Sequence, residues 1–333
     1  MSDATDGTAT SDADGDGVTN VAIACQGGGS HTAFTAGVLQ EILAWWDDAE
    51  YELVGISGTS GGAFNALATW FGLVTGDAEK AIRTLDALWE DLAADGWQDR
   101  TLNAWLTTYA RLESSGVALP QVSPYQLPDS WGQRHIARIL ERHIDFETIP
   151  DLCGTDAPEL VVGTVNVNAG EFETFTNEDV TTEAVLASAA VPNLFRAVEI
   201  NGHLHWDGLF SQNPPIDDLM HVPPERKPDE LWVIQINPQQ SAGEPTTLEE
   251  IADRRNELSG NISLNQEVKF IERVNDWIDE GYLPADQFTH TDIHRIQMDQ
   301  RFDSTTKVDR DRAFIEELLA TGRESATAFL DGR

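Results

Sequence analysis

The stretch Leu53-Val54-Gly55-Ile56-Ser57-Gly58-Thr59-Ser60-Gly61-Gly62 decides how this chain folds. It begins as the apolar run of a strand, and an apolar helical pattern follows it to about Val74. Between the two, Gly58-Thr59-Ser60-Gly61-Gly62 fits the pattern G-x-S-x-G, in which a sharp turn between strand and helix exposes a serine. The glycines remove Cβ atoms that such a turn would bring into collision. We therefore predict a nucleophile elbow of Gly58, Thr59 and Gly62, with Ser60 as the nucleophile.

The same order of strand, turn and helix occurs immediately upstream. An apolar run from Val18 to Cys25 leads into Gly27-Gly28-Gly29, and a helical pattern covers about 32–46. Two such units in succession predict a parallel sheet covered on both faces. The expected fold is therefore α/β, a three-layer sandwich with a mostly parallel central sheet. Further strands are expected at 160–167, 172–175, 198–200, 203–206, 231–236 and 293–298, and helices at 77–95, 135–144, 181–190, 247–280 and 309–330.

One domain is expected, over residues 18–333, after a disordered acidic tail at 1–17. Asp12, Asp14 and Asp16 alternate in this tail as at the start of a calcium loop, but the closing Glu is missing, so we predict no calcium site. Residues 96–131 are rich in aromatic side chains without a period. They are interpreted either as a cap or lid over an apolar pocket or as ordinary packing of an irregular segment.

The composition is strongly acidic, with 57 Asp and Glu against 21 Lys and Arg, a formal net charge of -36. Such a chain repels phosphates, so nucleic acid is not expected as a partner. It also repels itself unless salt screens it, and at about 1 M salt the Debye length falls to about 3 Å. We therefore predict a protein of an extreme halophile. A start without a signal peptide pattern and only two cysteines predict a cytoplasmic location.

The Gly27-Gly28-Gly29 turn is a candidate oxyanion hole, because consecutive glycines let backbone N–H groups approach a substrate oxygen. A dinucleotide fingerprint is the competing interpretation, but its third glycine would fall at Thr32. No Lys-Ser/Thr pair follows, which excludes a phosphate-binding P-loop. A nucleotide-binding or interaction protein that uses the glycine turns structurally remains an alternative.

Ser60 needs a base, and the histidines are poor candidates. His221 lies in a Pro-rich turn, and His290 and His294 flank an expected strand. His203 and His205 alternate on the second strand of a hairpin around Asn201-Gly202. Asp207 lies where that strand ends and is followed by a glycine, so its carboxylate could reach across the sheet edge to Ser60.

These segments together resemble the patatin-like phospholipase family over roughly residues 18–300. The resemblance is carried by Gln26-Gly27-Gly28-Gly29-Ser30-His31, the elbow from Gly55 to Gly62, Ser188-Ala189-Ala190-Val191-Pro192, Trp206-Asp207-Gly208 and Asn213-Pro214-Pro215. Two segments depart from the family pattern. The basic residue and glycine expected after the glycine turn are His31 and Thr32, and Leu209 follows Asp207-Gly208.

The resemblance implies a Ser60–Asp207 catalytic dyad without histidine, metal or other cofactor. It implies an oxyanion hole formed by the amides of Gly27, Gly28, Gly29, Ser30 and Gly61. The implied activity is hydrolysis of lipid acyl esters, with a lipid or polyester as the substrate partner and transient contact with a membrane or granule surface. An intracellular polyhydroxyalkanoate depolymerase with the same dyad is an alternative.

Overall fold

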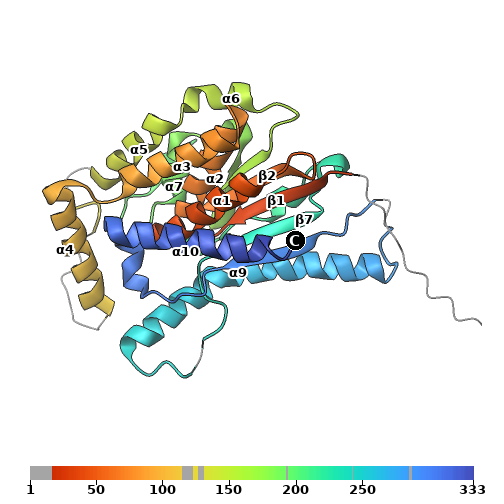
Figure 1. Ribbon diagram of the computed structural model, residues 1–333. Coiled ribbons are helices and arrows are strands. Elements are labelled where there is room, and N and C mark those ends of the chain that lie inside the picture. Colours follow the sequence, from red (N-terminus) through yellow and green to blue (C-terminus); the bar gives the residue numbers. More distant parts are fainter. Residues whose placement is uncertain (1–16, 115–122, 127–130, 193, 242, 285–286) are drawn as a thin grey trace, which may run out of the picture.

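The computed structural model describes residues 17–114, 123–126, 131–192, 194–241, 243–284 and 287–333 (Figure 1). The tail with Asp12, Asp14 and Asp16 lies outside these residues, as do parts of the 96–131 segment. Among the described residues, none of the helices combines the length and the apolar character that crossing a membrane requires.

The core of the fold is one mixed sheet with the strand order β5-β6-β3-β2-β1-β7-β8, in which β4 also pairs with β3. Strands β1, β2, β3, β7 and β8 run parallel, and β4, β5 and β6 are antiparallel to their neighbours. The described strands are β1 Thr19–Cys25, β2 Tyr51–Thr59, β3 Glu159–Asn166, β4 Glu171–Thr176, β5 Val198–Ile200, β6 His203–Asp207, β7 Glu230–Gln235 and β8 Asp292–Gln297. The predicted mostly parallel α/β sheet is confirmed.

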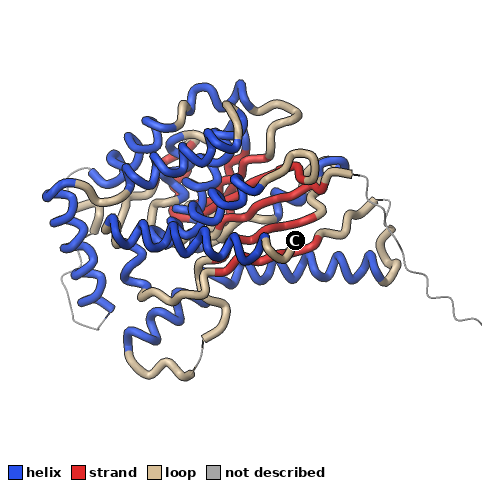
Figure 2. Tube along the Cα trace, in the orientation of Figure 1, coloured by secondary structure: helices blue, strands red, loops and turns tan. Residues whose placement is uncertain are grey.

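Helices cover both faces of this sheet, as Figure 2 shows. The described α-helices are α1 Ala33–Trp45, α2 Gly61–Val74, α3 Ala78–Leu92, α4 Gly96–Ser114, α5 Trp131–His143, α6 Ile149–Leu152, α7 Thr182–Ser188, α8 Asp217–Met220, α9 Leu248–Asp279 and α10 Arg312–Leu330. Alternate residues of β1 enter two separate buried clusters. Ile23 packs in the cluster with α1, α2, α3 and α10, whereas Ala24 packs in the cluster with α8 and α9. The molecule therefore has three layers.

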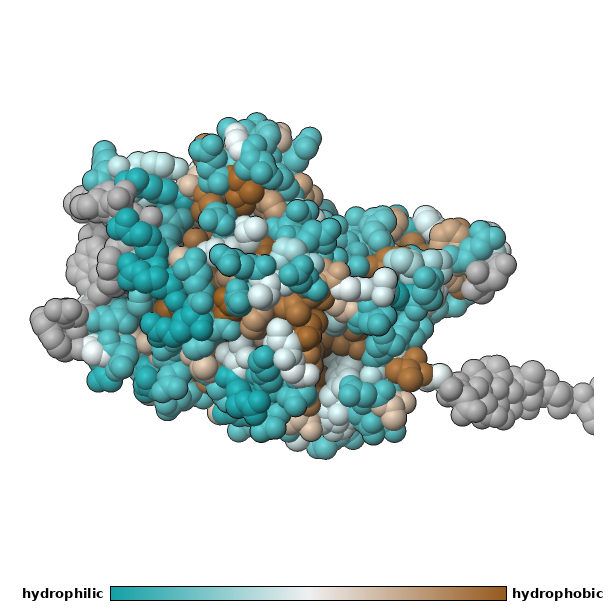
Figure 3. All heavy atoms as spheres, turned by 90° about the horizontal axis from the view of Figure 1, so that it is seen from above, coloured by the Kyte–Doolittle hydropathy of each residue, from teal (hydrophilic) through white to brown (hydrophobic). Residues whose placement is uncertain are grey.

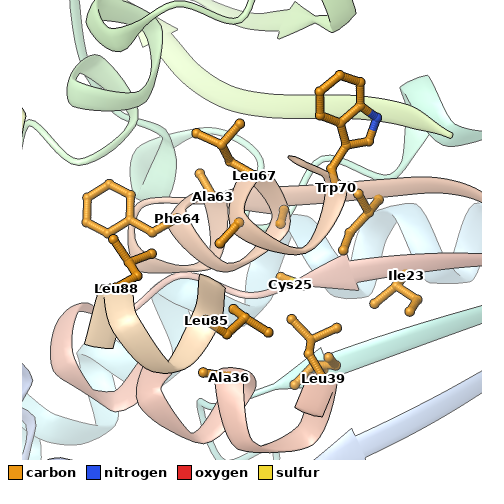
Figure 4. Close-up of a cluster of buried hydrophobic side chains, with 14 of the residues drawn as sticks. Ile23, Cys25, Ala36, Leu39, Ala63, Phe64, Leu67, Trp70, Leu85 and Leu88 are labelled. Carbon is orange, nitrogen blue, oxygen red and sulfur yellow. The ribbon is translucent and has the colours of Figure 1, made fainter. Parts of the chain in front are cut away.

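The larger cluster fixes α2 against the sheet. Leu67 and Trp70 of α2 are fully buried, and Leu39 of α1 and Leu85 of α3 pack beneath the same helix (Figure 4). The Trp70 indole also donates a hydrogen bond to the carbonyl of Pro158, 2.7 Å away. Because burying each such side chain contributes about 1.5–3 kcal/mol, the start of α2 has a well-anchored position.

Two segments differ from expectation in detail. The aromatic segment from 96 is not irregular at its start, because Gly96–Ser114 forms α4. Charged and polar residues on several sides of this helix hid its 3.6-residue period. Where terminal helices were expected at 309–330, the structure has one helix, α10. The Asn201-Gly202 hairpin is confirmed, with φ values of 53° and 82° that suit the turn of a two-residue hairpin.

Candidate active site

Ser60 lies at the junction of β2 and α2, where the sequence predicts it. It is the N-cap residue of α2 with φ 56° and ψ −127°, a backbone conformation that a residue with a side chain rarely adopts. Gly58 and Gly62 lie back to back at this turn, since a Cβ on Gly58 would come 2.4 Å from the carbonyl carbon of Gly62. The neighbouring Thr59 hydroxyl donates to the carbonyl of Gln212 at 2.7 Å. These contacts build the sharp turn that presents the serine.

A second serine, Ser188 at the end of α7, braces the elbow. The backbone N–H of Ser60 donates to Ser188 Oγ at 2.8 Å, and Ser188 Oγ donates to the carbonyl of Gly163 at 2.7 Å. Ser188 is fully buried at the end of α7. The strained backbone of Ser60 is therefore held by a buried relay to β3, as strained residues at functional sites require.

Asp207 reaches Ser60 through the register of the sheet. Strand β2 pairs with β3 up to Thr59 opposite Gly163, and β6 pairs with β3 from Asp207 opposite Thr164. Thus β6 takes over the edge of β3 where β2 stops. Gly208 permits this close approach, because a Cβ there would lie 2.5 Å from the carbonyl oxygen of Gly163 and 2.9 Å from the Thr59 methyl group.

The structure brings the two predicted catalytic side chains together. The Ser60 side chain lies close enough to the Asp207 carboxyl group to affect its pKa, and the two residues are 7% and 1% exposed. The backbone N–H of Leu209 also donates to Asp207 Oδ1 at 2.8 Å. Burial raises the pKa of Asp207 to about 7, against the opposing effects of Leu209, Ser60 and Lys307. This carboxylate is therefore a far stronger base than an exposed aspartate.

The glycine turn lies between β1 and α1, facing the elbow. Gly29 has φ 59° and opens a short 3-10 helix, Gly29–Thr32, which runs into α1. The first N–H groups of a helix have no hydrogen-bond partner within the helix. Gly29 and Ser30 occupy such positions in the 3-10 helix, and Gly61 occupies one at the start of α2. The Gly27 N–H instead donates to Asn213 Oδ1 at 2.6 Å. Gly27 thus departs from its expected role, because its amide is engaged within the protein.

The departure from the family pattern at His31 and Thr32 has a structural explanation. The Thr32 hydroxyl donates to the carbonyl of Gly29 at 2.6 Å and so closes the turn with its own side chain. His31 is 3% exposed, packs against Phe302 and Phe314, and contacts Thr306 Oγ1 at 2.7 Å. Burial, with help from Lys307, lowers the pKa of His31 to about 3. His31 is therefore a neutral packing residue behind the turn.

Lys307 lies directly behind the glycine turn. A Cβ on Gly28 would come 3.8 Å from Lys307 Cε, and a Cβ on Gly29 would come 2.2 Å from the Lys307 carbonyl oxygen. Its ammonium donates to Asn237 Oδ1 at 2.9 Å, beside a small pocket that Asp253 and Glu257 also line. Burial lowers the pKa of Lys307, whereas Glu257, Asp253 and Asp207 favour its charged form. This places a cation near the candidate dyad.

The histidines downstream of Asp207 contact other carboxylates. His221 lies 3.3 Å from Asp217, His294 lies 3.5 Å from Glu230, and His290 lies 3.6 Å from Asp292. His205, two residues before Asp207, pairs with Glu173 at 2.9 Å. Each of the three histidines that follow Asp207, and His205 before it, is therefore paired with a carboxylate other than Asp207.

Three residues of this neighbourhood were not assigned a role from the sequence. Ser188 and Asn213 lie in segments that carry the family resemblance. The resemblance therefore marked these segments, but it did not predict the contacts of the two side chains. Lys307 gave none, because it lies far along the chain in a polar segment, Ser304–Val308, that the fold returns to the glycine turn.

Comparison with known proteins places this chain in a family. A family model described as "Patatin-like phospholipase" matches residues 23–220, more than half of the 333 residues. The search of curated proteins gives no match. Among solved structures, the crystal structure of VipD from Legionella pneumophila is similar at 13% sequence identity and a TM-score of 0.41, over 91% of this chain and 67% of that one. On the match of the family model, the chain belongs to the patatin-like phospholipase family.

Proposed function

We propose that this protein is a serine-dependent hydrolase of lipid acyl esters, with Ser60 as nucleophile and Asp207 as general base. One observation carries the proposal: a serine on a strained elbow lies beside a buried carboxyl group of raised pKa. Membership of the patatin-like phospholipase family supports lipid esters as the substrate class.

The reaction proceeds in two halves. Asp207 takes the proton of the Ser60 hydroxyl as the oxygen attacks the ester carbonyl carbon. As the tetrahedral intermediate collapses, the departing alkoxide receives this proton, which leaves an acyl-serine. Water, deprotonated by Asp207, then attacks the acyl carbon, and the proton returns to Ser60 when the carboxylic acid leaves.

The oxyanion that forms in each half needs donors placed before the reaction begins. We assign this role to the N–H groups of Gly28 and Gly29, assisted by Ser30 and Gly61. The start of α2 adds positive potential at the same place, because the N-terminal end of a helix dipole is positive. Each such donor is worth roughly 100-fold or more in turnover.

The raised pKa of Asp207 answers an objection to a two-residue mechanism. An exposed aspartate, with a pKa of about 3.9, is a weak base for a hydroxyl. Burial disfavours the charged carboxylate, and this cost is relieved when the carboxylate accepts the serine proton. The environment that makes the ionised form costly thus makes proton transfer easier.

Salt is part of the proposed working environment. With a net charge of -36, the carboxylates of this chain repel one another, and this repulsion weakens as the Debye length shrinks. We propose that the enzyme folds and works at high ionic strength, as an intracellular protein of a halophile would.

Hydrolysis of a short p-nitrophenyl ester in high salt tests the activity. Wild-type protein is expected to release p-nitrophenol, and Ser60→Ala is expected to be inactive. Ser57→Ala is the matched control, because Ser57 is also fully buried on β2 and its hydroxyl has no hydrogen-bond partner within the described residues. An inactive wild type, or an active Ser60→Ala, would reject the proposal. A panel of phospholipid, triacylglycerol and polyester granules would then rank the substrates.

A further inference from the structure

Helix α9, Leu248–Asp279, is apolar on two opposite faces. Its inner face packs on the sheet through Leu264, Val268 and Ile271, which are at most 8% exposed. Its outer face carries Leu248, Ile251, Leu258, Ile262, Phe270 and Trp277, each between 40% and 64% exposed. A surface helix ordinarily presents polar residues opposite its buried side. The outer face of α9 is therefore an apolar surface that the sheet does not cover.

The six residues of the outer face form one stripe. At about 100° of rotation per residue, they lie within roughly 120° of the helix circumference. The helix has 32 residues, so the stripe runs for most of about 48 Å. Helix α9 runs along the lower edge of the molecule in Figure 1, whereas the upper face, seen in Figure 3, is mostly hydrophilic with hydrophobic residues in small areas.

The middle of the outer face has a charge opposite to that of the chain. From Ile251 to Phe270, the exposed positions that the structure describes on α9 include no carboxylate, although 57 of the 333 residues are Asp or Glu. The exposed polar residues there are Arg255, Ser259, Gln266 and Lys269, and one turn later Arg273 lies between the exposed carboxylates Glu272 and Asp276. The three basic side chains form no ion pair with the described carboxylates.

We propose that the outer face of α9 docks the protein on the surface of an anionic phospholipid bilayer. An apolar stripe flanked by Lys and Arg and containing Trp is the pattern of a helix that lies in the plane of a lipid interface. The aliphatic stems of Arg255, Lys269 and Arg273 can follow the apolar surface while their charged ends meet phosphate groups. The absence of exposed carboxylates over this stretch removes the local repulsion that the remainder of the surface would produce.

A second copy of the chain fits this face less well. Antiparallel pairing of two α9 helices about Ile262 would set Arg255 opposite Lys269 of the other copy. Parallel pairing would set each cation against its equivalent. Like charges directly opposite one another destabilise a pair, whereas an anionic lipid surface complements all three cations.

The inner face of the same helix contacts the candidate active site. A Cβ on Gly260 would lie 3.7 Å from Leu209 Cδ1, and Leu209 is the residue whose amide hydrogen-bonds to Asp207. Ser263 Oγ accepts the backbone N–H of Asn213 at 3.1 Å. One helix thus carries the lipid-facing stripe on one side and supports the loop after Asp207 on the other. The inference rests on the proposed function in this respect, because docking would bring the hydrolase to its substrate.

Vesicle flotation of an inactive Ser60→Ala background tests the docking itself. Vesicles of phosphatidylglycerol with phosphatidylcholine are compared with vesicles of phosphatidylcholine alone, at the lowest salt at which circular dichroism shows each variant folded. The Ser60→Ala protein is expected to float with the anionic vesicles. Adding Ile262→Ser and Phe270→Ser should lower the partition coefficient at least about tenfold for each residue. Phe172→Ser is the matched control, because Phe172 is 62% exposed on β4, away from α9.

A second pair of variants tests the charge. Lys269→Glu with Arg273→Glu should weaken binding to the anionic vesicles more than binding to the neutral ones. Arg83→Glu with Arg100→Glu makes the same change in net charge at two exposed residues elsewhere and should leave the preference unchanged. Failure of the Ser60→Ala protein to float, or equal flotation of the α9 variants, would overturn the proposal.

Two further measurements distinguish lipid docking from self-association and from a failure of the proposed hydrolase function. If light scattering shows that Ile262→Ser with Phe270→Ser converts a dimer into a monomer without altering flotation, the outer face is a self-association surface and the lipid proposal is wrong. The same α9 substitutions in the active protein should leave hydrolysis of a soluble p-nitrophenyl ester unchanged. A wild type inactive on that ester would reject the proposed function but not the flotation result.

Discussion

Thr59 and Asp207 pair with consecutive residues of β3, Gly163 and Thr164, from opposite directions along the same edge. Strand β2 is parallel to β3 and ends there, and β6 is antiparallel to β3 and ends at the same point. Ser60, which follows Thr59, therefore meets a carboxylate from a distant part of the chain. Sheet register, more than any loop, creates the contact on which the proposed chemistry depends.

Replacing Asp207 by Asn should abolish ester hydrolysis and stabilise the fold at neutral pH. The pKa of Asp207 is raised from 3.8 to about 7 in the folded protein. Because the folded pKa is the higher one, this group favours folding below about pH 4, and that contribution is lost as pH rises through about 7. The penalty above pH 7 is up to about 4 kcal/mol, on the order of 1.4 kcal/mol per pH unit. Urea unfolding at pH 5 and pH 8 should show a larger gain for Asp207→Asn at pH 8, because only about one pH unit of the shift acts at pH 5. Equal effects at both pH values would contradict the assignment of the raised pKa.

The rate of ester hydrolysis should fall on the acid side of about pH 7, since only the ionised Asp207 can accept the serine proton. Lys307 helps to keep the pKa of Asp207 from rising further. Lys307→Met should therefore move the acid limb of kcat/KM to higher pH, apart from any loss of turnover. Lys227→Met is the control, because the Lys227 ammonium bonds to the carbonyl of Met220 on the α8 side. An unchanged acid limb in Lys307→Met would show that this cation does not act on the dyad.

Ser188→Ala should lower turnover by roughly tenfold to 100-fold and destabilise the protein by about 1–3 kcal/mol. The substitution leaves the N–H of Ser60 and the carbonyl of Gly163 without their partner in a buried place. The effect on kcat should exceed the effect on KM, because Ser188 orients the nucleophile and does not bind the acyl chain. A variant that loses stability but keeps wild-type kcat would show that the elbow does not need this brace.

Potassium chloride should stabilise the fold. Raising its concentration from about 0.1 M to about 1 M shortens the Debye length from about 10 Å to about 3 Å, which weakens the repulsion among 57 acidic residues. Urea unfolding is the suitable measurement, because urea carries no charge. The urea midpoint should rise with potassium chloride and rise less with an osmotically matched amount of sucrose. A midpoint insensitive to salt would contradict the halophilic proposal.

The parts of the fold that follow from local pattern were predictable from the sequence. Continuous apolar runs predicted β1 and β2, helical patterns predicted α1 and α2, and the Asn201-Gly202 turn predicted the β5-β6 hairpin. Gly58 and Gly62 marked the elbow, because few other structures need glycines on both sides of a serine. The contact between Ser60 and Asp207 was inferable only with the family resemblance, since the sequence states neither strand order nor register.

Long-range contacts account for what the sequence did not predict. The Gly27 amide is engaged by Asn213, and Lys307 is brought behind the turn by a segment near the other end of the chain. Neither Gly27 nor Lys307 lies in a local sequence pattern that predicts these contacts. The outer face of α9 was visible in the sequence as apolar residues, but only the structure shows which of its two apolar faces the sheet covers.

Labelling with a fluorophosphonate, followed by mass spectrometry of the labelled peptide, tests the nucleophile most directly. The probe reacts with an activated serine, and we predict a single adduct on Ser60, absent from Ser60→Ala, strongly slowed in Asp207→Asn and unchanged in His205→Gln. An adduct on another residue, labelling that persists in Ser60→Ala, or a loss in His205→Gln as deep as that in Asp207→Asn would contradict the dyad.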